Sequence, residues 1–245
     1  MWFRKQDPAF RGGSFETIAG FGPNGAVVHY RATEATNRDI KGSGLLLLDS
    51  GGQYAGGTTD ITRVLAVGDP DDDMRIHYTA VLKSHIAVAR AVFPRGTTGA
   101  FLDALSRAPL WAQGIDYGHR LGHGVGCFLS VHEPAVDLSA RGRDEILPGM
   151  VVSNEPGYYR DGEYGIRLEN LVLVEPAVQV GPDYRCLETL SLVPFEPALT
   201  KLSMLSAEEK SWLSTYHTRI MDEIGPMLSG QDRMWLEVTC RYFLV

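Results

Sequence analysis

The sequence predicts an α+β fold in which antiparallel strands come first, a pair of helices follows, and further strands come after the helices. Short strand-like runs bounded by glycine-rich turns fill the first part of the chain. One long apolar stripe at helical spacing comes next. More strand-like runs then lead into an amphipathic helical C-terminus. Strands and helices segregated along the chain in this way are typical of α+β proteins.

Length and composition describe an ordinary globular chain of one large domain or two small ones. It has 245 residues, of which 44% are apolar and 22% charged. The net charge of −7 argues against non-specific binding to nucleic acid or to anionic membranes. No apolar run is long enough to span a bilayer, and the first residues lack the core of a signal peptide. Three cysteines without a CxxC spacing argue against disulfides and thiolate metal sites, so we expect a cytoplasmic protein.

The first strands are predicted to form an antiparallel meander. Residues up to about Gly25 have the character of a loop, with one short extended piece around Ser14–Ile18. The predicted strands are Ala26–Arg31, Gly44–Asp49 and Asp60–Val67. The second is apolar on both faces and is therefore expected to be buried. Glycine-rich turn chemistry at 50–57 separates it from the third.

Two helices are predicted next. The acidic run Asp69–Asp73 favours a helix start, because carboxylates stabilise the positive end of a helix dipole. Apolar residues then repeat at helical spacing to about Phe93, where Pro94 ends the helix. His85 lies on that apolar stripe and is predicted to be a buried, hydrogen-bonded core histidine. A shorter helix is predicted at Thr98–Arg107.

Strands are predicted again after a glycine-rich histidine segment, at Met150–Asn154, at about Tyr164–Glu175 and at about Arg185–Pro194. The helix pair before these strands has no counterpart before the first three strands, because Asp7–Ile18 shows no helical pattern. If the fold is a duplicated helix-helix-strands unit, we therefore expect its front helices to be absent.

The C-terminus is predicted to be a helical extension. Ser206–Glu209 has the form of a capping box, and one apolar stripe runs from there to Gly225-Pro226. A second amphipathic helix is predicted at Asp232–Tyr242, and His217, off the stripe, is predicted to be solvated. We expect residues 1–197 to form a catalytic domain and 198–245 a helical extension.

Three histidines gather in the segment His119–His132, between glycines that let other groups approach closely. Histidine is the commonest neutral metal ligand, and its charge changes near physiological pH. Taken alone, the segment is equally compatible with a glycine-rich loop that carries incidental histidines.

Four carboxylates strengthen the interpretation of His123 as a ligand. They are Asp49, Asp60, Glu155 and Glu169, each placed in an apolar or glycine-rich strand where an unpaired charge is costly. Each alone is most simply a salt-bridged or strand-edge acid. Together with one imidazole they suit two divalent ions such as Mn²⁺, Co²⁺ or Zn²⁺. The residues thus predict a di-metal hydrolase without naming the bond that it cleaves.

The same residues lie in motifs that resemble those of the pita-bread metallopeptidases. The motifs are Leu48-Asp49-Ser-Gly, Thr59-Asp60-Ile-Thr-Arg63, Gly122-His123-Gly-Val-Gly126, Asn154-Glu155-Pro-Gly-Tyr158 and Ile166-Arg167-Leu-Glu169-Asn170. Gly25-Ala-Val-Val-His29-Tyr-Arg and the helical tail are similar to the long, cytosolic Xaa-Pro aminopeptidases. The resemblance runs from about Asp7 to about Trp235.

The resemblance implies an α+β pita-bread fold, with helices on the outer face of a curved antiparallel sheet, and two metal ions, most simply Mn²⁺. Asp49 and Asp60 would hold one ion, with Asp60 bridging. His123 and Glu155 would hold the other, with Glu169 bridging.

The resemblance also implies roles around the metals. Glu155 would take up the proton of a shared hydroxide that attacks the carbonyl before proline. His132 would shuttle a proton, and His119 would assist catalysis and, with His29, line the substrate pocket. Tyr159 and Arg167 would support these groups and the bound peptide.

The implied activity is removal of the N-terminal residue from peptides with proline second. A prolidase restricted to dipeptides and a catalytically silent pita-bread binding module are the alternatives. Long family members carry two domains and a helix ahead of the catalytic part, and we expect these to be absent here, with apolar surface left uncovered. Neither a nucleic-acid nor a membrane partner is expected, and a homodimer stays open.

Overall fold

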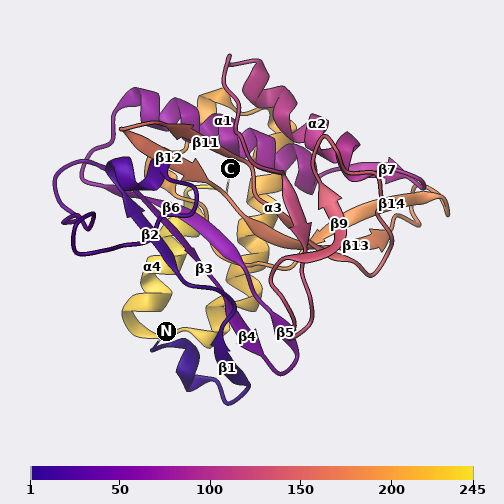
Figure 1. Ribbon diagram of the computed structural model, residues 1–245, viewed down its shortest axis with the longest axis horizontal. Coiled ribbons are helices and arrows are strands. Elements are labelled where there is room, and N and C mark those ends of the chain that lie inside the picture. The colour runs from indigo at the N-terminus through magenta and orange to yellow at the C-terminus, as the bar shows by residue number, and fades with distance from the viewer. Residues whose placement is uncertain (1, 245) are drawn as a thin grey trace.

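A three-stranded and a six-stranded antiparallel sheet form the frame of the protein in residues 2–244, the part of the chain that the computed structural model describes (Figure 1). The smaller sheet has the order β2-β3-β6, with bounds Ile18–Phe21, Gly44–Ser50 and Ile61–Val67. The larger has the order β7-β14-β13-β10-β8-β9. Its bounds, in that order, are Val92–Pro94, Tyr184–Thr189, Asn170–Pro176, Val151–Asn154, Gly122–Gly124 and Glu133–Leu138.

Two smaller pieces of sheet complete the strands of the described chain. Strands β11 (Gly157–Arg160) and β12 (Tyr164–Arg167) form a hairpin. Strands β1 (Phe10–Gly13), β4 (Gly52–Tyr54) and β5 (Gly57–Thr58) form a small sheet at the glycine-rich turn. That turn connects β3 to β6, so it brings the ends of those two strands together.

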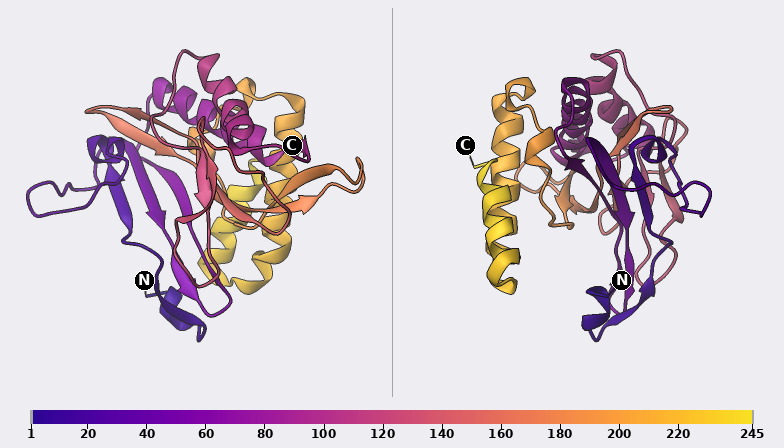
Figure 2. Two further views of the ribbon diagram at one scale, coloured as in Figure 1. Left: turned by 45° about the vertical axis from the view of Figure 1, so that its right-hand side comes forward. Right: turned by 90° about the vertical axis from the view of Figure 1, so that its left-hand side faces the viewer.

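Helices lie on two sides of this frame. They are α1 (Asp72–Ala89), α2 (Gly99–Trp111), α3 (Ala207–Glu223) and α4 (Gly230–Arg241). Figure 2 shows α3 and α4 as a layer of their own on one side of the molecule. The predicted capping box of α3 is present, with Ser206 and Glu209 bonding each other's backbone N–H. In residues 2–244 no helix is long and apolar enough to cross a membrane.

The apolar core has two clusters, and the larger one includes the C-terminal helices. One cluster packs α1 and α2 on the six-stranded sheet through side chains such as Val88, Leu102 and Val172. The other joins Leu47 of β3 and Tyr78 of α1 to a set of C-terminal residues. That set includes Phe195, Leu213, Tyr216, Ile220, Leu236 and Cys240. The predicted helical extension therefore shares a core with the strands that carry the motifs.

The prediction of a strand at Ala26–Arg31 is wrong. Residues Gly22–Ala26 form a 3-10 helix, and the N–H of Tyr30 closes a turn on the carbonyl of Val27. Gly22 has a positive φ, a conformation that glycine adopts without steric cost. The strand that pairs with β3 is β2 instead, and the residues after Gly25 form a turn.

Several predicted boundaries also shift for local reasons. Helix α1 stops at Ala89 because Val92–Pro94 pairs with β14 as strand β7. Helix α2 extends to Trp111, past Pro109. The strand predicted at Tyr164–Glu175 is interrupted between β12 and β13, and the interruption holds Leu168 and Glu169. Strand β14 ends at Thr189, five residues short of the predicted Pro194.

The two predictions about histidines on the helices have opposite outcomes. His85 is fully buried and hydrogen-bonded to Leu168 and Asn170, as predicted. His217 is also fully buried, so its prediction as a solvated residue is wrong. Its Nδ1 donates to the carbonyl of Leu213, and its Nε2 accepts from the N–H of Phe195. The side chain therefore connects α3 to the segment after β14.

Candidate metal centre and substrate pocket

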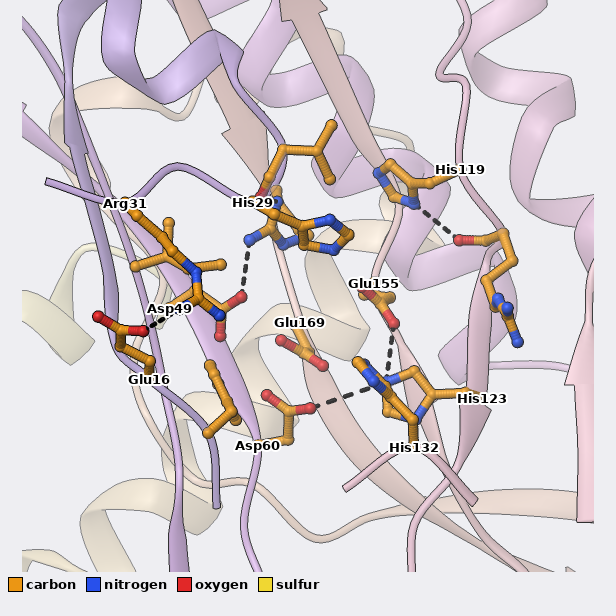
Figure 3. A pocket seen from close by; sticks show the side chains of 15 residues that line it. Glu16, His29, Arg31, Asp49, Asp60, His119, His123, His132, Glu155 and Glu169 are labelled. Carbon is orange, nitrogen blue, oxygen red and sulfur yellow. Dashed lines mark hydrogen bonds and ion pairs between the residues drawn. The ribbon is translucent and has the colours of Figure 1, made fainter. Parts of the chain in front are cut away.

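The predicted metal ligands all line one cavity of about 630 Å³ (Figure 3). Its lining comprises Phe15, Glu16, Ile18, Val28, His29, Arg31, Asp49, Asp60, His119, Arg120, His123, His132, Glu155, Arg167 and Glu169. In Figure 3 four carboxylates and His123 point toward one another on the floor of the cavity. Arg31, Glu16 and His29 lie toward one side of the cavity in Figure 3, and His119 lies across from them.

The two aspartates come from the smaller sheet. Asp49 lies on the same face of β3 as the buried Leu45 and Leu47, because side chains alternate along a strand. Asp60 immediately precedes β6, whose Thr62 pairs with Asp49 across the ladder. Oδ2 of Asp49 accepts a 2.7 Å bond from Nη2 of Arg167, whereas its buried Oδ1 has no partner. An unpaired buried carboxylate oxygen of this kind is suited to coordinate a cation.

The two glutamates come from the far side of the site. Glu169 sits in the interruption between β12 and β13, is 2% exposed, and accepts a 2.6 Å bond from Oγ1 of Thr62. Glu155 directly follows β10. Oε1 of Glu155 accepts a 2.9 Å bond from Oγ of Ser153, which also receives the backbone N–H of His123. Ser153 thus fixes a carboxylate and the histidine segment together.

His123 reaches the carboxylates from β8, where a Cβ at Gly122 would meet the carbonyl oxygen of Ser153 at 2.0 Å. Glycine is therefore required for β8 to approach β10 so closely. Nδ1 of His123 lies 2.9 Å from the carbonyl oxygen of Gly124, which only accepts, so Nδ1 carries a proton. Nε2 faces Glu155 at 3.2 Å and Asp60 at 3.7 Å. Burial opposes a charge on this ring, but the hydrogen bond to Glu155 and the neighbouring carboxylates raise the pKa of His123, so Nε2 carries a proton that a bound cation would displace. In metal-binding histidines, a hydrogen bond from the ring nitrogen that does not bind the metal fixes the orientation of the ring.

Three of these groups already have the spacing of a metal site. Ligand atoms of Asp60, His123 and Glu169 lie within 4.8 Å of one another, and all three residues are buried. The donor set of carboxylate oxygens and one imidazole is hard, with no thiolate, which fits a divalent ion. With Asp49 and Glu155 beside it, the cluster offers enough oxygens for two ions that share bridging carboxylates.

Electrostatics point the same way. Burial, together with the charges of Asp49 and Glu155, raises the pKa of Asp60 to about 8. Burial also raises the pKa of Asp49 and the pKa of Glu169. Burial opposes the charge on Glu155 too, but the hydrogen bond and charge of His123 hold its pKa low. Crowded buried carboxylates resist ionisation without cations, so a cation that binds here displaces protons.

A hydrogen-bonded chain connects His119, Tyr159 and Arg167. Tyr159 donates its hydroxyl proton to Nε2 of His119 at 2.9 Å, because Nδ1 of that ring donates to the carbonyl of Arg120. Nη1 of Arg167 donates to the Tyr159 oxygen at 2.8 Å. Arg167, 2% exposed, also holds Asp49. Tyr159 itself does not line the cavity. It acts on the cavity only through His119 and Arg167, which do line it.

His132 and His29 lie at the more open part of the cavity. The ring of His132 stands edge-on to that of His123, with centroids 4.3 Å apart. Partial burial and the neighbouring His123 lower the pKa of His132, which favours its neutral form. His29 lies in the turn after the 3-10 helix rather than on the predicted strand. Both side chains are accessible from the cavity.

Some residues of the site were not singled out from the sequence. Thr62 and Ser153 hold Glu169 and Glu155 by hydrogen bonds, and the polar Ser153 in the apolar run Val151–Asn154 could have indicated its role. Arg120, Arg31 and Glu16 line the cavity, and the last two form an ion pair. Their exposure and charge are ordinary for a loop, so nothing in the sequence marks them.

Comparisons with known proteins agree with this arrangement. Residues 1–176 match the model of metallopeptidase family M24, and residues 183–243 match the C-terminal region of these peptidases. The chain is 44% identical to aminopeptidase P1 of Lotus japonicus over 96% of its length, which is 37% of that protein. The chain spans about two fifths of the length of the curated relatives that it matches.

Solved structures share the fold. An X-prolyl aminopeptidase from Caenorhabditis elegans, described as a cytosolic enzyme with a di-nuclear active site, matches with a TM-score of 0.91 and 36% identity. That match covers 98% of this chain and 40% of the other. A prolidase from Pyrococcus furiosus matches with a TM-score of 0.65 and 30% identity over 74% of this chain and 50% of the other. The predicted pita-bread fold is confirmed, and the chain belongs to metallopeptidase family M24.

Proposed function

We propose that this chain carries the catalytic site of a di-metal Xaa-Pro aminopeptidase, which removes the N-terminal residue from peptides with proline second. The observation that carries the proposal is the convergence of Asp60, His123 and Glu169 within 4.8 Å, next to the unpaired oxygen of Asp49. The likeness to an X-prolyl aminopeptidase with a di-nuclear active site supports it.

The proposed ligand assignment is the one that the family resemblance implies, and the positions of the side chains support it. Asp49 and Asp60 would hold one ion, and His123 with Glu155 the other. Asp60 and Glu169 lie between the two groups and would bridge them. The oxygen-rich donor set is compatible with Mn²⁺, and Co²⁺ or Zn²⁺ would fit the same ligands. Two bound ions would polarise the scissile carbonyl and lower the pKa of the attacking water.

The chain's own residues would supply the proton transfers. The carboxylate of Glu155, which Ser153 holds in place, would accept a proton from the attacking water. A second proton must reach the proline nitrogen as it leaves. His132 is accessible, next to His123, and largely neutral, so its ring can bind and relay that proton. His119 lines the same cavity, held by Tyr159, and would assist by shaping it.

Substrate binding would use the wall around the metals. His29 and His119 would line the substrate pocket. A ring N–H of His29 can donate to a peptide carbonyl, whereas both ring nitrogens of His119 are held by Arg120 and Tyr159, so His119 would shape the pocket wall. Arg167 acts mainly by holding Asp49, and Tyr159 by holding His119 and Arg167. The cavity of about 630 Å³ has room for a short peptide.

A prolidase is the second candidate, and the likeness to the Pyrococcus furiosus prolidase favours it. A silent binding module has less support, because all five proposed ligands are present and converge on one cavity. We also propose residues 1–197 as the catalytic domain, 198–245 as its helical extension, and a cytoplasmic location. The free cysteines and the cytosolic relative support that location. A homodimer stays a prediction.

Elemental analysis and a peptide panel on the same sample test the proposal. After Mn²⁺ loading we expect two metal ions per chain and cleavage of a Xaa-Pro-Xaa tripeptide. Cleavage of the Xaa-Pro dipeptide alone would replace the proposal by the prolidase. Absence of stoichiometric metal would leave only the binding module.

A further inference from the structure

Arg63 is a buried cation without a carboxylate partner. Its side chain is 7% exposed, and no acidic group in residues 2–244 lies within ion-pair distance of it. Instead its guanidinium donates to backbone and neutral side-chain oxygens and stacks over the ring of Phe195, 4.5 Å from the centroid. A buried charge is costly unless its hydrogen bonds are satisfied, so such a placement needs a reason.

The reason lies in what Arg63 connects. On one side Nη1 donates to the carbonyl of Glu169 at 2.6 Å, and Nη2 donates to Oδ1 of Asn170 at 2.7 Å. On the other side Nη2 donates to the carbonyl of Val193 at 2.7 Å, and Nε donates to that of Pro194 at 3.1 Å. One planar group thus binds the interruption between β12 and β13 and the segment that leads into the C-terminal helices.

Tyr216 of α3 closes this connection. Its hydroxyl accepts a 3.0 Å bond from Nη2 of Arg63 and lies 2.8 Å from the carbonyl oxygen of Val193. Asn170 also donates to this hydroxyl, at 3.4 Å. Residues 183–243, which match the C-terminal region of the family, therefore contact the backbone of a proposed metal ligand through a single buried cation.

His85 of α1 also holds the interruption between β12 and β13. Nδ1 of His85 donates to the carbonyl of Leu168 at 3.1 Å, and Nε2 of the same ring receives Nδ2 of Asn170 at 3.2 Å. Three consecutive residues, 168 to 170, thus have their backbone or side chain fixed by Arg63 or His85. Glu169 lies in the middle of these three residues and lines the cavity, and Thr62 holds its carboxylate.

We propose that Arg63 is a positioning residue for Glu169, and that through it the C-terminal helices form part of the support of the metal site. The inference rests on the proposed metal site. Without Arg63 the peptide of Glu169 loses its strongest partner and can rotate, which moves the bridging carboxylate. Partners of metal ligands typically change metal affinity or activity by about 10–100-fold when removed.

Arg63→Met tests this, because methionine fills the space without donors. Arg219→Met is the matched control, since Arg219 also joins α3 to the larger sheet, through Thr189 and Glu188, but away from the cavity. The readouts are thermal unfolding of the metal-free proteins, Co²⁺ affinity, and the visible spectrum of bound Co²⁺. Bound Co²⁺ reports ligand geometry, which a loss of stability alone does not change.

We expect both variants to unfold earlier, and only Arg63→Met to bind Co²⁺ about 10–100-fold more weakly with an altered spectrum. Wild-type affinity and spectrum in Arg63→Met would overturn the inference and leave the proposed function intact. If Arg63→Met does not fold, Arg63→Lys and Tyr216→Phe carry the test, with weaker Co²⁺ binding expected for each and wild-type binding contradicting the proposal. Absence of Co²⁺ binding by the wild-type protein would refute the proposed function, and this inference with it.

Discussion

Oγ1 of Thr62 donates a 2.6 Å hydrogen bond to Oε2 of Glu169, and the backbone N–H of Glu169 donates in return to the carbonyl of Thr62. This reciprocal pair joins the smaller sheet to the interruption between β12 and β13. It fixes one oxygen of the Glu169 carboxylate, so the orientation of a proposed bridging ligand depends in part on this hydroxyl group, beside the backbone contact that Arg63 makes.

Thr62→Val should therefore weaken metal binding while the fold is retained, because valine has nearly the same shape without the hydroxyl. We expect a loss of about 10–100-fold in metal affinity or turnover. Titration with Co²⁺ or Mn²⁺ measures it. Thr79→Val, which removes a buried hydroxyl on α1 outside the cavity, is the control. Equal metal affinity in the two variants would count against a role for Thr62.

Asp60→Asn should bind fewer than two metal ions, because an amide cannot bridge two cations as a carboxylate does. The metal-free variant should be more stable than metal-free wild type at neutral pH, since it lacks a crowded buried acid. Asp103→Asn offers a contrast, because Asp103 is equally buried but paired with Arg107, and its loss should destabilise. Elemental analysis and denaturant unfolding measure both effects. Two ions bound to Asp60→Asn would refute the bridging role.

The stability gain from Asp60→Asn should depend on pH. The pKa of Asp60 is about 8 in the folded state and near 3.8 in the unfolded chain. Between these values the folded state keeps a proton that the unfolded state releases, so metal-free wild type loses stability as pH rises from about 4 to about 8. Asp60→Asn should escape that loss, and the difference between the two proteins should grow over this range. Denaturant unfolding at a series of pH values with a chelator present checks it, and a pH-independent difference would contradict it.

His132→Ala should keep both metal ions and lower turnover by about 10²–10⁴-fold, the usual effect of losing a general acid–base group. The metals are retained because His132 contacts His123 only through the ring edge. Steady-state kinetics and elemental analysis on one sample separate the two effects. His77→Ala, outside the cavity, should leave turnover near that of wild type. A drop in metal content would identify His132 as a ligand instead.

His217→Leu should lower the free energy of unfolding by about 1–3 kcal/mol, because it leaves the buried N–H of Phe195 without an acceptor. The lowered pKa of His217, about 4 because of burial, adds a pH dependence. The unfolded chain gains a proton below its pKa of 6.5, so the wild-type protein loses this contribution as pH falls from about 6.5 to about 4. Thr218→Leu, exposed on the same helix, should change little, and a similar small effect for His217→Leu would mean that the ring is not needed.

The strands that lead to Asp49 and Glu155 could be predicted because each is a short apolar run that ends at an acid, and this pattern is local. The interruption that holds Glu169 could not be predicted, because the apolar pattern continues through it. The family motifs then indicated how these residues meet. The turn at Val27–Tyr30 could not be predicted, because it depends on the hydrogen bonds of the Tyr30 hydroxyl to Asn24 and Thr36, which the apolar run Ala26–Val28 does not reveal. The burial of His217 depends on the segment at Phe195, which its own helix does not reveal. The role of Arg63 could not be predicted from its motif, because the carbonyl groups that it binds lie 106 and 130 residues away in the sequence.

The cavity floor is shared between the two sheets, and this has a consequence for how the protein folds. Thr62 and Glu169 are separated by 107 residues, and Arg167 and Asp49 by 118. Loops of that length close late, because their entropy cost comes before any contact rewards it. Helix α1 and the antiparallel pair β3–β6 can form early, because their contacts are local. The ligand cluster can form only after the smaller and the larger sheet have come together. Recovery of metal binding during refolding should therefore lag behind recovery of the helical signal.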